Sequence, residues 1–201
     1  TQHDMPKGEG GSVAYGDGVF VAVNHSSNTS ARSTDNGVTW TQHVMPNKEW
    51  ESVAYGDGTF VAVSYDSNTS ARSTDNGKTW TQHDMPIEGW RGITYGDGVF
   101  VAVSSSSNTC ATSTDNGVTW TQHDMPNGGW ISVAYGNGVF VAVSYSSNTS
   151  VTSTDNGKTW TQHDMPDGDW CSVAYGDGVF VAVSSSSNTS VTSTDNGETW
   201  K

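Results

Sequence analysis

Short apolar and β-branched runs, each bounded by glycine or polar turns, recur along the whole chain. One run is almost continuously apolar, as expected of a strand that is buried on both faces. Asp75, Asn76 and Gly77 form a turn signal, because Asn and Gly tolerate positive φ and the Asp side chain can bond the turn amides. The pattern therefore predicts four antiparallel strands in this part of the chain, at residues 50–56, 59–64, 68–73 and 79–84.

The same pattern returns every 40 residues without insertion or deletion. A unit of this size buries too little surface to fold alone, so the copies must be units of one assembly. Four strands per 40-residue repeat are typical of a β-propeller blade. We therefore expect residues 1–201 to form a single all-β domain, a five-bladed β-propeller with four antiparallel strands per blade. Aligned on TQH, the copies start at Thr1, Thr41, Thr81, Thr121 and Thr161.

The two ends of the sequence suggest how the ring closes. Residues 1–5 repeat the body of the fourth strand, and residues 199–201 repeat its beginning. We expect Thr1–Met5 to lie beside residues 188–193, to complete the last blade and to remove an open sheet edge. An open solenoid is the alternative, but it would want distinct polar caps at both ends, and the end copies are not capped in that way.

Composition narrows the classes of fold and partner. The chain has no leucine, three isoleucines and 21 aromatic residues, which excludes a helical bundle and argues against disorder. A formal charge of −13 argues against a nucleic acid or an anionic membrane as partner. No apolar run approaches the roughly 18 residues of a membrane span. We expect neither a nucleic-acid nor a membrane partner.

An eight-residue motif, S-x-D-x-G-x-T-W, occurs in every copy, first at residues 33–40 as STDNGVTW. It resembles the Asp-box, or BNR repeat, of sialidase-like β-propellers in bacteria and phages. In that family the box lies on the hairpin between the third and fourth strands. The resemblance implies that its Asp organises the turn and that its Trp packs between sheets; it also favours an extracellular location. The aspartates that it assigns to the fold are Asp35, Asp75, Asp115, Asp155 and Asp195.

Enzymatic activity is not expected from this pattern. The resemblance implies that sialidase catalysis needs three arginines around one carboxylate, and this chain has only Arg32, Arg72 and Arg91. Two of these occupy equivalent repeat positions, so the ring would hold them apart. Near-perfect repetition also argues against one asymmetric catalytic constellation. We therefore expect no catalytic residue and no cofactor.

Metal binding and a disulfide are also not expected. Each copy has one histidine at the same position, and repetition spreads these possible ligands apart. Cys110 and Cys171 lie on different strands of non-adjacent copies, so we expect two free thiols.

Six repeat positions, 7, 8, 9, 11, 25 and 38, carry three or more residue types, and five of these lie on the face that carries the longer loops. Position 11 differs in every copy, and positions 7 and 25 also vary, whereas position 38 varies on the opposite, tight-turn face. Either exposed loops have drifted, or the loop face is a recognition surface tuned copy by copy. The residues are Gly11, Glu51, Arg91, Ile131 and Cys171 at position 11; His25, Tyr65, Ser105, Tyr145 and Ser185 at position 25; and Lys7, Asn47, Ile87, Asn127 and Asp167 at position 7.

Two functions remain open. The first is a non-catalytic, lectin-like module that binds a glycan or a peptide multivalently on the loop face, and the second is a symmetric repeat scaffold without a ligand. The tryptophans that enter the inner strands could stack on sugar rings, or they could pack in the core. We expect a monomer in either case. The candidate ligand-binding residues are Trp50, Trp90, Trp130, Trp170, Glu51, Arg91, Tyr65, Asp66, Tyr145 and His25.

Overall fold

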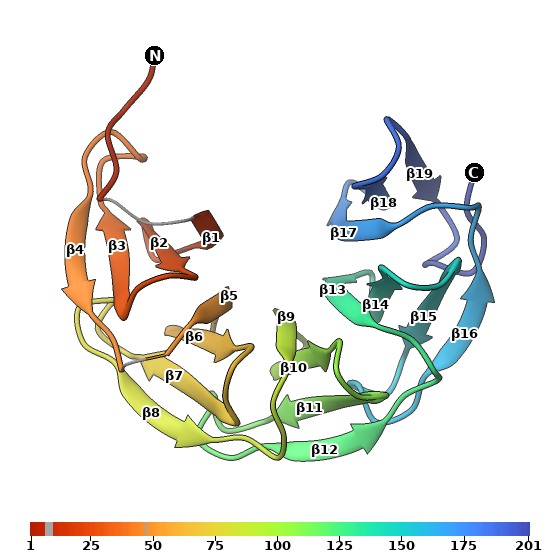
Figure 1. The fold of residues 1–201 in the computed structure, drawn as a ribbon, viewed down its shortest axis with the longest axis horizontal. Helices are drawn as coiled ribbons and strands as arrows, with labels where there is room; N and C mark the ends of the chain where they lie inside the picture. The colour runs from red at the N-terminus through yellow and green to blue at the C-terminus, as the bar shows by residue number, and fades with distance from the viewer. Residues whose placement is uncertain (7–9, 47) are drawn as a thin grey trace.

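The computed structural model describes residues 1–6, 10–46 and 48–201, and these residues form five antiparallel sheets in an arc (Figure 1). Each sheet is a blade in which the strands are neighbours in sequence order, from an inner strand outward. The strands are β1 Gly10–Gly16, β2 Val19–Asn24, β3 Thr29–Ser33, β4 Thr41–Val44, β5 Trp50–Gly56, β6 Thr59–Ser64, β7 Thr69–Ser73, β8 Thr81–Asp84, β9 Trp90–Gly96, β10 Val99–Ser104, β11 Thr109–Ser113, β12 Thr121–Asp124, β13 Trp130–Gly136, β14 Val139–Ser144, β15 Thr149–Ser153, β16 Thr161–Asp164, β17 Trp170–Gly176, β18 Val179–Ser184 and β19 Ser190–Ser193.

The strands predicted in the second sheet are close to those observed. β5 and β6 have the predicted bounds, while β7 begins one residue later and β8 two residues later than expected. The delay in β8 has a local cause, because the backbone and hydroxyl of Thr79 both donate to the carboxylate of Asp75. Thr79 therefore belongs to the turn and not to the strand ladder.

The hydrophobic core lies between neighbouring blades. At the first junction Val21 of β2 packs in one cluster with Trp50 and Phe60 of the next blade. Equivalent clusters occur at the other three junctions. For this reason β6, β10 and β14 are buried along their whole length. One blade alone has no enclosed core, which agrees with the expectation that a single copy cannot fold.

The junctions share the same aromatic contact, and three of the four share an indole-to-serine hydrogen bond. The ring of Tyr55 lies so close to Gly16 of the preceding blade that a Cβ at Gly16 would overlap it. The indole of Trp80 donates to the hydroxyl of Ser30 at 3.1 Å, and Trp120 and Trp200 make the same bond to the blades before them. The Asp-box tryptophans Trp80, Trp120, Trp160 and Trp200 thus pack between sheets, as the resemblance implied.

The arc is open in this structure, so the expected closing pair is not found. The last sheet has three strands, and Thr1–Pro6 form no strand. Lys201 stands at the same repeat position as Thr1, and its backbone pairs with Thr192, at 2.9 and 3.0 Å. Lys201 therefore takes the first place of the fourth strand, which Thr1 was expected to take. The two termini lie on opposite sides of the opening (Figure 1).

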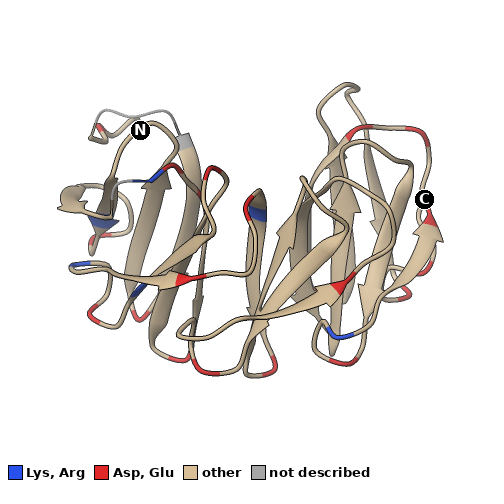
Figure 2. Ribbon diagram, turned by 60° about the horizontal axis from the view of Figure 1, so that its bottom comes forward, with Lys and Arg blue, Asp and Glu red and all other residues tan. Residues whose placement is uncertain are grey.

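No helix in the described ranges is long and apolar enough to cross a membrane. Asp and Glu residues occupy turns along the lower face of the arc in Figure 2 and also occur in loops of the upper face.

Candidate binding site

The two faces of the arc carry different connections, as the sequence predicted. On one face lie the tight turns, where Asp57 and Asn116 have positive φ and the amide of Asn116 donates to the Asp57 carboxylate at 3.1 Å. On the other face lie the longer loops, where the backbone of Gly89 donates to the carbonyl of Tyr65 at 2.9 Å. We call these the turn face and the loop face.

The Asp-box carboxylates are bound within their own turns. Asp35 accepts bonds from the Thr39 hydroxyl at 2.6 Å, the Thr39 backbone at 2.8 Å and the Ser33 hydroxyl at 2.8 Å. These donors lower the pKa of Asp35 to about 2, and the same donors in the last copy lower that of Asp195 to about 2. The arrangement recurs in all five copies, so these aspartates organise the turns.

On the loop face a charged cluster links three blades. Arg91 donates to Glu51 at 2.8 Å, and its guanidinium lies 3.8 Å from the centre of the Tyr65 ring. The imidazole of His25 approaches the other oxygen of Glu51 to 2.6 Å and forms an ion pair when it is protonated. That oxygen has no aligned hydrogen-bond donor among the described residues. The first three copies are thus joined by residues at positions 11 and 25.

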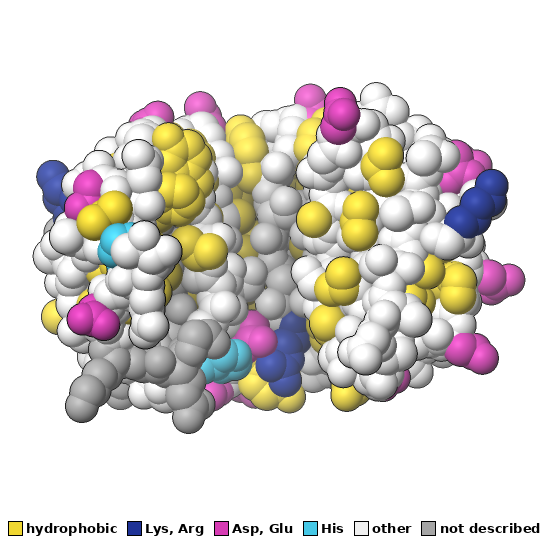
Figure 3. All heavy atoms as spheres, turned by 90° about the horizontal axis from the view of Figure 1, so that it is seen from above, with side chains coloured by type: hydrophobic (Ala, Val, Ile, Leu, Met, Phe, Trp, Pro, Cys, Tyr) yellow, Lys and Arg dark blue, Asp and Glu magenta, His cyan; other side chains and the backbone are white. Residues whose placement is uncertain are grey.

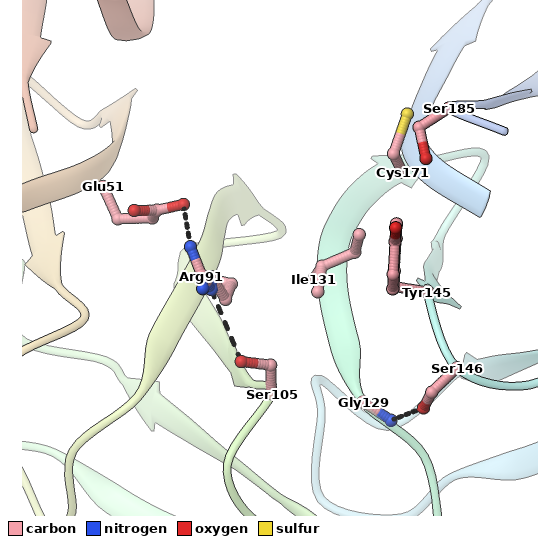
Figure 4. Close-up of a pocket in the computed structure, with 9 residues that line it drawn as sticks. All are labelled: Glu51, Arg91, Ser105, Gly129, Ile131, Tyr145, Ser146, Cys171 and Ser185. Atoms are coloured by element: carbon pink, nitrogen blue, oxygen red, sulfur yellow. Dashed lines mark hydrogen bonds and ion pairs between the residues drawn. The ribbon is translucent and has the colours of Figure 1, made fainter. Parts of the chain in front are cut away.

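Beside this cluster lies a pocket of about 490 Å³ on the loop face (Figure 4). Glu51 and Arg91 form one wall, and the side chains of Ile131 and Tyr145 face them from the other side. The side chain of Tyr145 is half exposed. Seven of the nine lining residues come from positions 11 and 25, and the full lining is Glu51, Arg91, Ser105, Gly129, Ile131, Tyr145, Ser146, Cys171 and Ser185.

The four candidate indoles do not face this pocket. Trp50, Trp90 and Trp130 have 0% exposure and Trp170 has 1%, so no ring face is open to a sugar. The indole of Trp130 donates to the carbonyl of Pro126 at 3.0 Å and so satisfies its polar atom inside the core. These tryptophans therefore pack in the core. Their candidacy for stacking on sugar rings was wrong, because their ring faces are buried.

Three other candidates, Tyr65, Asp66 and His25, lie outside the pocket lining. Asp66 accepts the Ser64 hydroxyl at 2.6 Å and the Glu49 backbone at 3.3 Å, which fixes its own loop. His25 and Arg91 contact different oxygens of the Glu51 carboxylate. Conversely, Ile131, Cys171 and the serines were not singled out as candidates. The signal for most of them was present, because they occupy the positions at which the copies differ.

The three arginines do not meet. Arg32 and Arg72 donate to the carbonyls of Asn76 and Asn116 in the next blade, at 2.8 and 2.9 Å, on the turn side of the sheets. Arg91 lies on the loop face, so the arginine cluster of a sialidase is not formed. Among the described residues no three His, Cys, Asp or Glu side chains are placed to share a metal ion.

Both cysteines are free thiols. Cys110 is buried at a blade junction, where burial raises the pKa of its thiol to about 12. Cys171 borders the pocket, and its thiol lies 3.5 Å from the carbonyl of Val183. Burial therefore keeps the Cys110 thiol in its protonated form, which is a poor nucleophile.

Comparisons with known proteins agree with the repeat and the fold. A sequence profile of the BNR/Asp-box repeat matches residues 71–82, 151–162 and 191–201. The chain therefore contains BNR/Asp-box repeats. No curated protein matches its sequence.

Solved structures share the propeller architecture at low sequence identity. A catalytically inactive virginiamycin B lyase from Staphylococcus aureus with quinupristin is similar with a TM-score of 0.82 and 19% identity, over 96% of this chain and 69% of that one. A structure of a nidogen/laminin complex is similar with a TM-score of 0.75 and 12% identity, over 90% of this chain and 74% of that one. YCF48 bound to a D1 peptide is similar with a TM-score of 0.72 and 17% identity, over 96% of this chain and 66% of that one. These similarities establish a β-propeller fold.

Proposed function

We propose that this chain is a non-catalytic recognition module that binds a peptide in the loop-face pocket. The observation that carries the proposal is that the variable positions of four copies converge on one cavity. Repeated residues build the frame, and the residues that differ line the hollow.

The chemistry of the pocket suits a peptide segment. Ile131 and Tyr145 offer an apolar wall for one side chain, and the hydroxyls of Ser105, Ser146 and Ser185 can bond backbone amides and carbonyls. The guanidinium of Arg91 is already paired with Glu51, so it adds little net charge. In the field of a chain with a formal charge of −13, a neutral or basic peptide is favoured over an acidic one.

The comparisons support a polypeptide as the ligand class. Two of the similar folds are described in a nidogen/laminin complex and with a bound D1 peptide. Two others are lyases, at 19% and 14% identity, so their chemistry does not transfer by resemblance. Within the pocket, the only thiol has a carbonyl and not a base as its partner, which favours binding over catalysis.

The pocket also changes the expected stoichiometry. A lectin-like surface with several equal sites needs the same contact residues in each copy, whereas here each copy contributes a different residue at position 11. We therefore expect one ligand per chain. A half-exposed Tyr145 could still contact a sugar, which makes glycan binding the second candidate.

The test is selection of phage-displayed linear peptides on the wild-type chain, followed by calorimetry and by a glycan array. Ile131→Glu and Tyr145→Ser each install a residue that another copy carries at the same position, so the fold should tolerate them. We expect one site per chain and at least a tenfold loss of peptide affinity in either variant.

The matched control is Val38→Lys on the turn face, which copies Lys78 and should leave peptide affinity unchanged. Glycan hits that depend on Tyr145, without peptide hits, would replace the peptide proposal with the lectin-like one. The absence of both would leave the ligand-free scaffold.

A further inference from the structure

Asparagine followed by glycine is a chemically labile pair in this chain. The side-chain amide is lost most readily at such pairs, because glycine has no Cβ to shield its backbone nitrogen. The chain contains seven of them: five in the Asp-box turns, one on the loop face, and one in the turn between β13 and β14. The asparagines are Asn36, Asn76, Asn116, Asn127, Asn137, Asn156 and Asn196.

At six of the seven pairs the glycine nitrogen is held by a hydrogen bond. The N–H of Gly77 donates to the Ser73 hydroxyl at 2.9 Å, and the other four Asp-boxes have the same bond at 2.8 or 2.9 Å. On the loop face the N–H of Gly128 donates to the side-chain oxygen of Asn108 at 3.2 Å. A bonded N–H must first lose its acceptor before its nitrogen can react, which raises the barrier.

The turn between β13 and β14 lacks this protection. Asn137 and Gly138 connect the paired residues Gly136 and Val139, and both turn residues are solvent exposed. The N–H of Gly138 has no hydrogen-bond partner among the residues that the structure describes. Nothing lies within 4 Å of an ideal Cβ at Gly138, so this side of the turn is open to water.

Backbone conformation does not separate this turn from the Asp-boxes. Asn137 has a φ of 51°, the five Asp-box asparagines have φ values from 59° to 62°, and the next glycine has a positive φ at all six sites. Asn36 is also solvent exposed, so exposure of the asparagine does not separate it from Asn137 either. The hydrogen bond on the glycine nitrogen is the difference between these two sites.

We propose that Asn137 is a site of spontaneous deamidation and the most reactive of the seven asparagines in the folded chain. The backbone nitrogen of Gly138 loses its proton and attacks Cγ of Asn137. The new C–N bond closes a succinimide ring, the bond from Cγ to the side-chain nitrogen breaks, and ammonia leaves. Water then opens the ring at either carbonyl, which gives an aspartate or an isoaspartate. Water is the only other reactant.

The aspartate product fits the junction between the fourth and fifth blades. The Asn137 amide donates to Oδ1 of Asn196 at 2.8 Å, and the equivalent Asn116 amide donates to the Asp57 carboxylate at 3.1 Å. The other four copies have aspartate at the position of Asn137. Figure 3 shows acidic side chains spread over the edges of the molecule and basic ones at only a few places. One more carboxylate is therefore tolerated.

The isoaspartate product does not fit in the same way. It adds a methylene group to the main chain inside a turn of two residues, between Gly136 and Val139, which are paired. We expect this product to loosen the turn and the hydrogen bond to Asn196. The modification thus acts through the backbone and not through charge.

The test is incubation of the folded chain in mildly alkaline buffer, with samples taken over time. Chymotrypsin cleaves after Trp, Tyr and Phe and so places the seven asparagines in separate peptides, whose masses report the loss of each amide. Electron-transfer fragmentation distinguishes aspartate from isoaspartate. We expect Asn137 to react about tenfold faster or more than each of the other six. In guanidinium chloride the seven rates should agree within about threefold, because glycine follows each asparagine.

Two variants separate the hydrogen bond from the sequence. Ser33→Ala removes the acceptor of the Gly37 N–H and should raise the rate at Asn36 about fivefold or more, with the rate at Asn137 unchanged. Thermal unfolding checks that this variant is folded at the incubation temperature. Asn137→Asp is the matched control for the product, and it should melt within about 2 °C of the wild type.

Three results would overturn the proposal. Another asparagine of the seven that reacts as fast as Asn137 in the folded chain would show that the hydrogen bond does not protect. An Asn137 that stays intact while the denatured chain reacts would show that the turn blocks the attack. An unchanged rate at Asn36 in folded Ser33→Ala would remove the physical basis of the selectivity.

Discussion

The junction between the fourth and fifth blades and the open face of the fifth blade are built from almost the same residues, yet they differ in every measure of packing. Val141 and Val143 are fully buried, while Val181 is half-buried and Val183 is exposed. The strands are equally regular on both sides, with the same register between inner and second strands. Sheet formation therefore depends on hydrogen bonds within a blade, whereas burial depends on the neighbour.

The turns behave differently from the faces. Asp115 in the middle of the arc and Asp195 in the last copy both accept bonds from a threonine hydroxyl, a threonine amide and a serine hydroxyl. These contacts span at most four residues, so position in the arc leaves them unchanged. The comparison separates local interactions, equal in every copy, from junction interactions, which are lost at the ends.

The largest expected effect comes from adding a methyl group to a glycine that the next blade covers. The same change at the open face of the fifth blade is the comparison. Gly136→Ala should reduce the free energy of unfolding by about 2–3 kcal/mol, because its Cβ overlaps the ring of Tyr175. Gly176→Ala should be close to neutral, since nothing lies within 4 Å of its Cβ. Urea unfolding measures both, and equal losses would contradict the distinction between junction and open face.

Removal of an Asp-box carboxylate should have a smaller effect that does not depend on position. Asp115→Ala should cost about 1–2 kcal/mol through the loss of its turn hydrogen bonds. Asp195→Ala, at the end of the arc, should have a similar cost. The two variants should therefore show similar decreases in melting temperature. A much smaller loss at the end would mean that the box acts through the junction and not through its own turn.

The bond across a junction can be tested by a single hydroxyl. Ser150→Ala leaves the buried indole of Trp200 without its acceptor at 2.9 Å and should cost about 1 kcal/mol. Ser190→Ala changes an exposed residue and should have no measurable effect on urea unfolding. If both variants were neutral, the indole contact would contribute nothing to the junction.

The smallest expected effect is the contribution of each Asp-box carboxylate to the pH dependence of stability. The pKa values of Asp35 and Asp195 are lowered from the usual 3.8 to about 2 in the folded chain. A depressed folded pKa contributes stability above the unfolded pKa, and this contribution is lost as pH falls from about 4 to 2. Because these groups are exposed, solvent screening keeps each contribution small. Thermal unfolding should show a decline in this window that is reduced in an Asp35→Asn, Asp195→Asn double variant.

The repeat explains why so much of the fold could be predicted. Apolar alternation and the DNG turns are local signals, and each is present five times. The strand bounds of β5 and β6 follow directly from them. The loop-face pocket was only partly predictable: variation at positions 11 and 25 pointed to Glu51, Arg91 and Tyr145. Ile131 and Cys171 became candidates only when the structure placed the inner strands around one opening.

The amino-acid sequence alone determined the elements of this protein, because turns, strand lengths and Asp-box bonds arise between residues that are close along the chain. It also determined which faces fit one another, since every junction uses the same glycine, tyrosine and tryptophan. The tertiary structure alone decided which indoles are inaccessible, which variable side chains share a cavity and whether the arc closes. Those outcomes depend on the angle between successive blades, which side-chain packing sets at each junction and no short sequence pattern encodes.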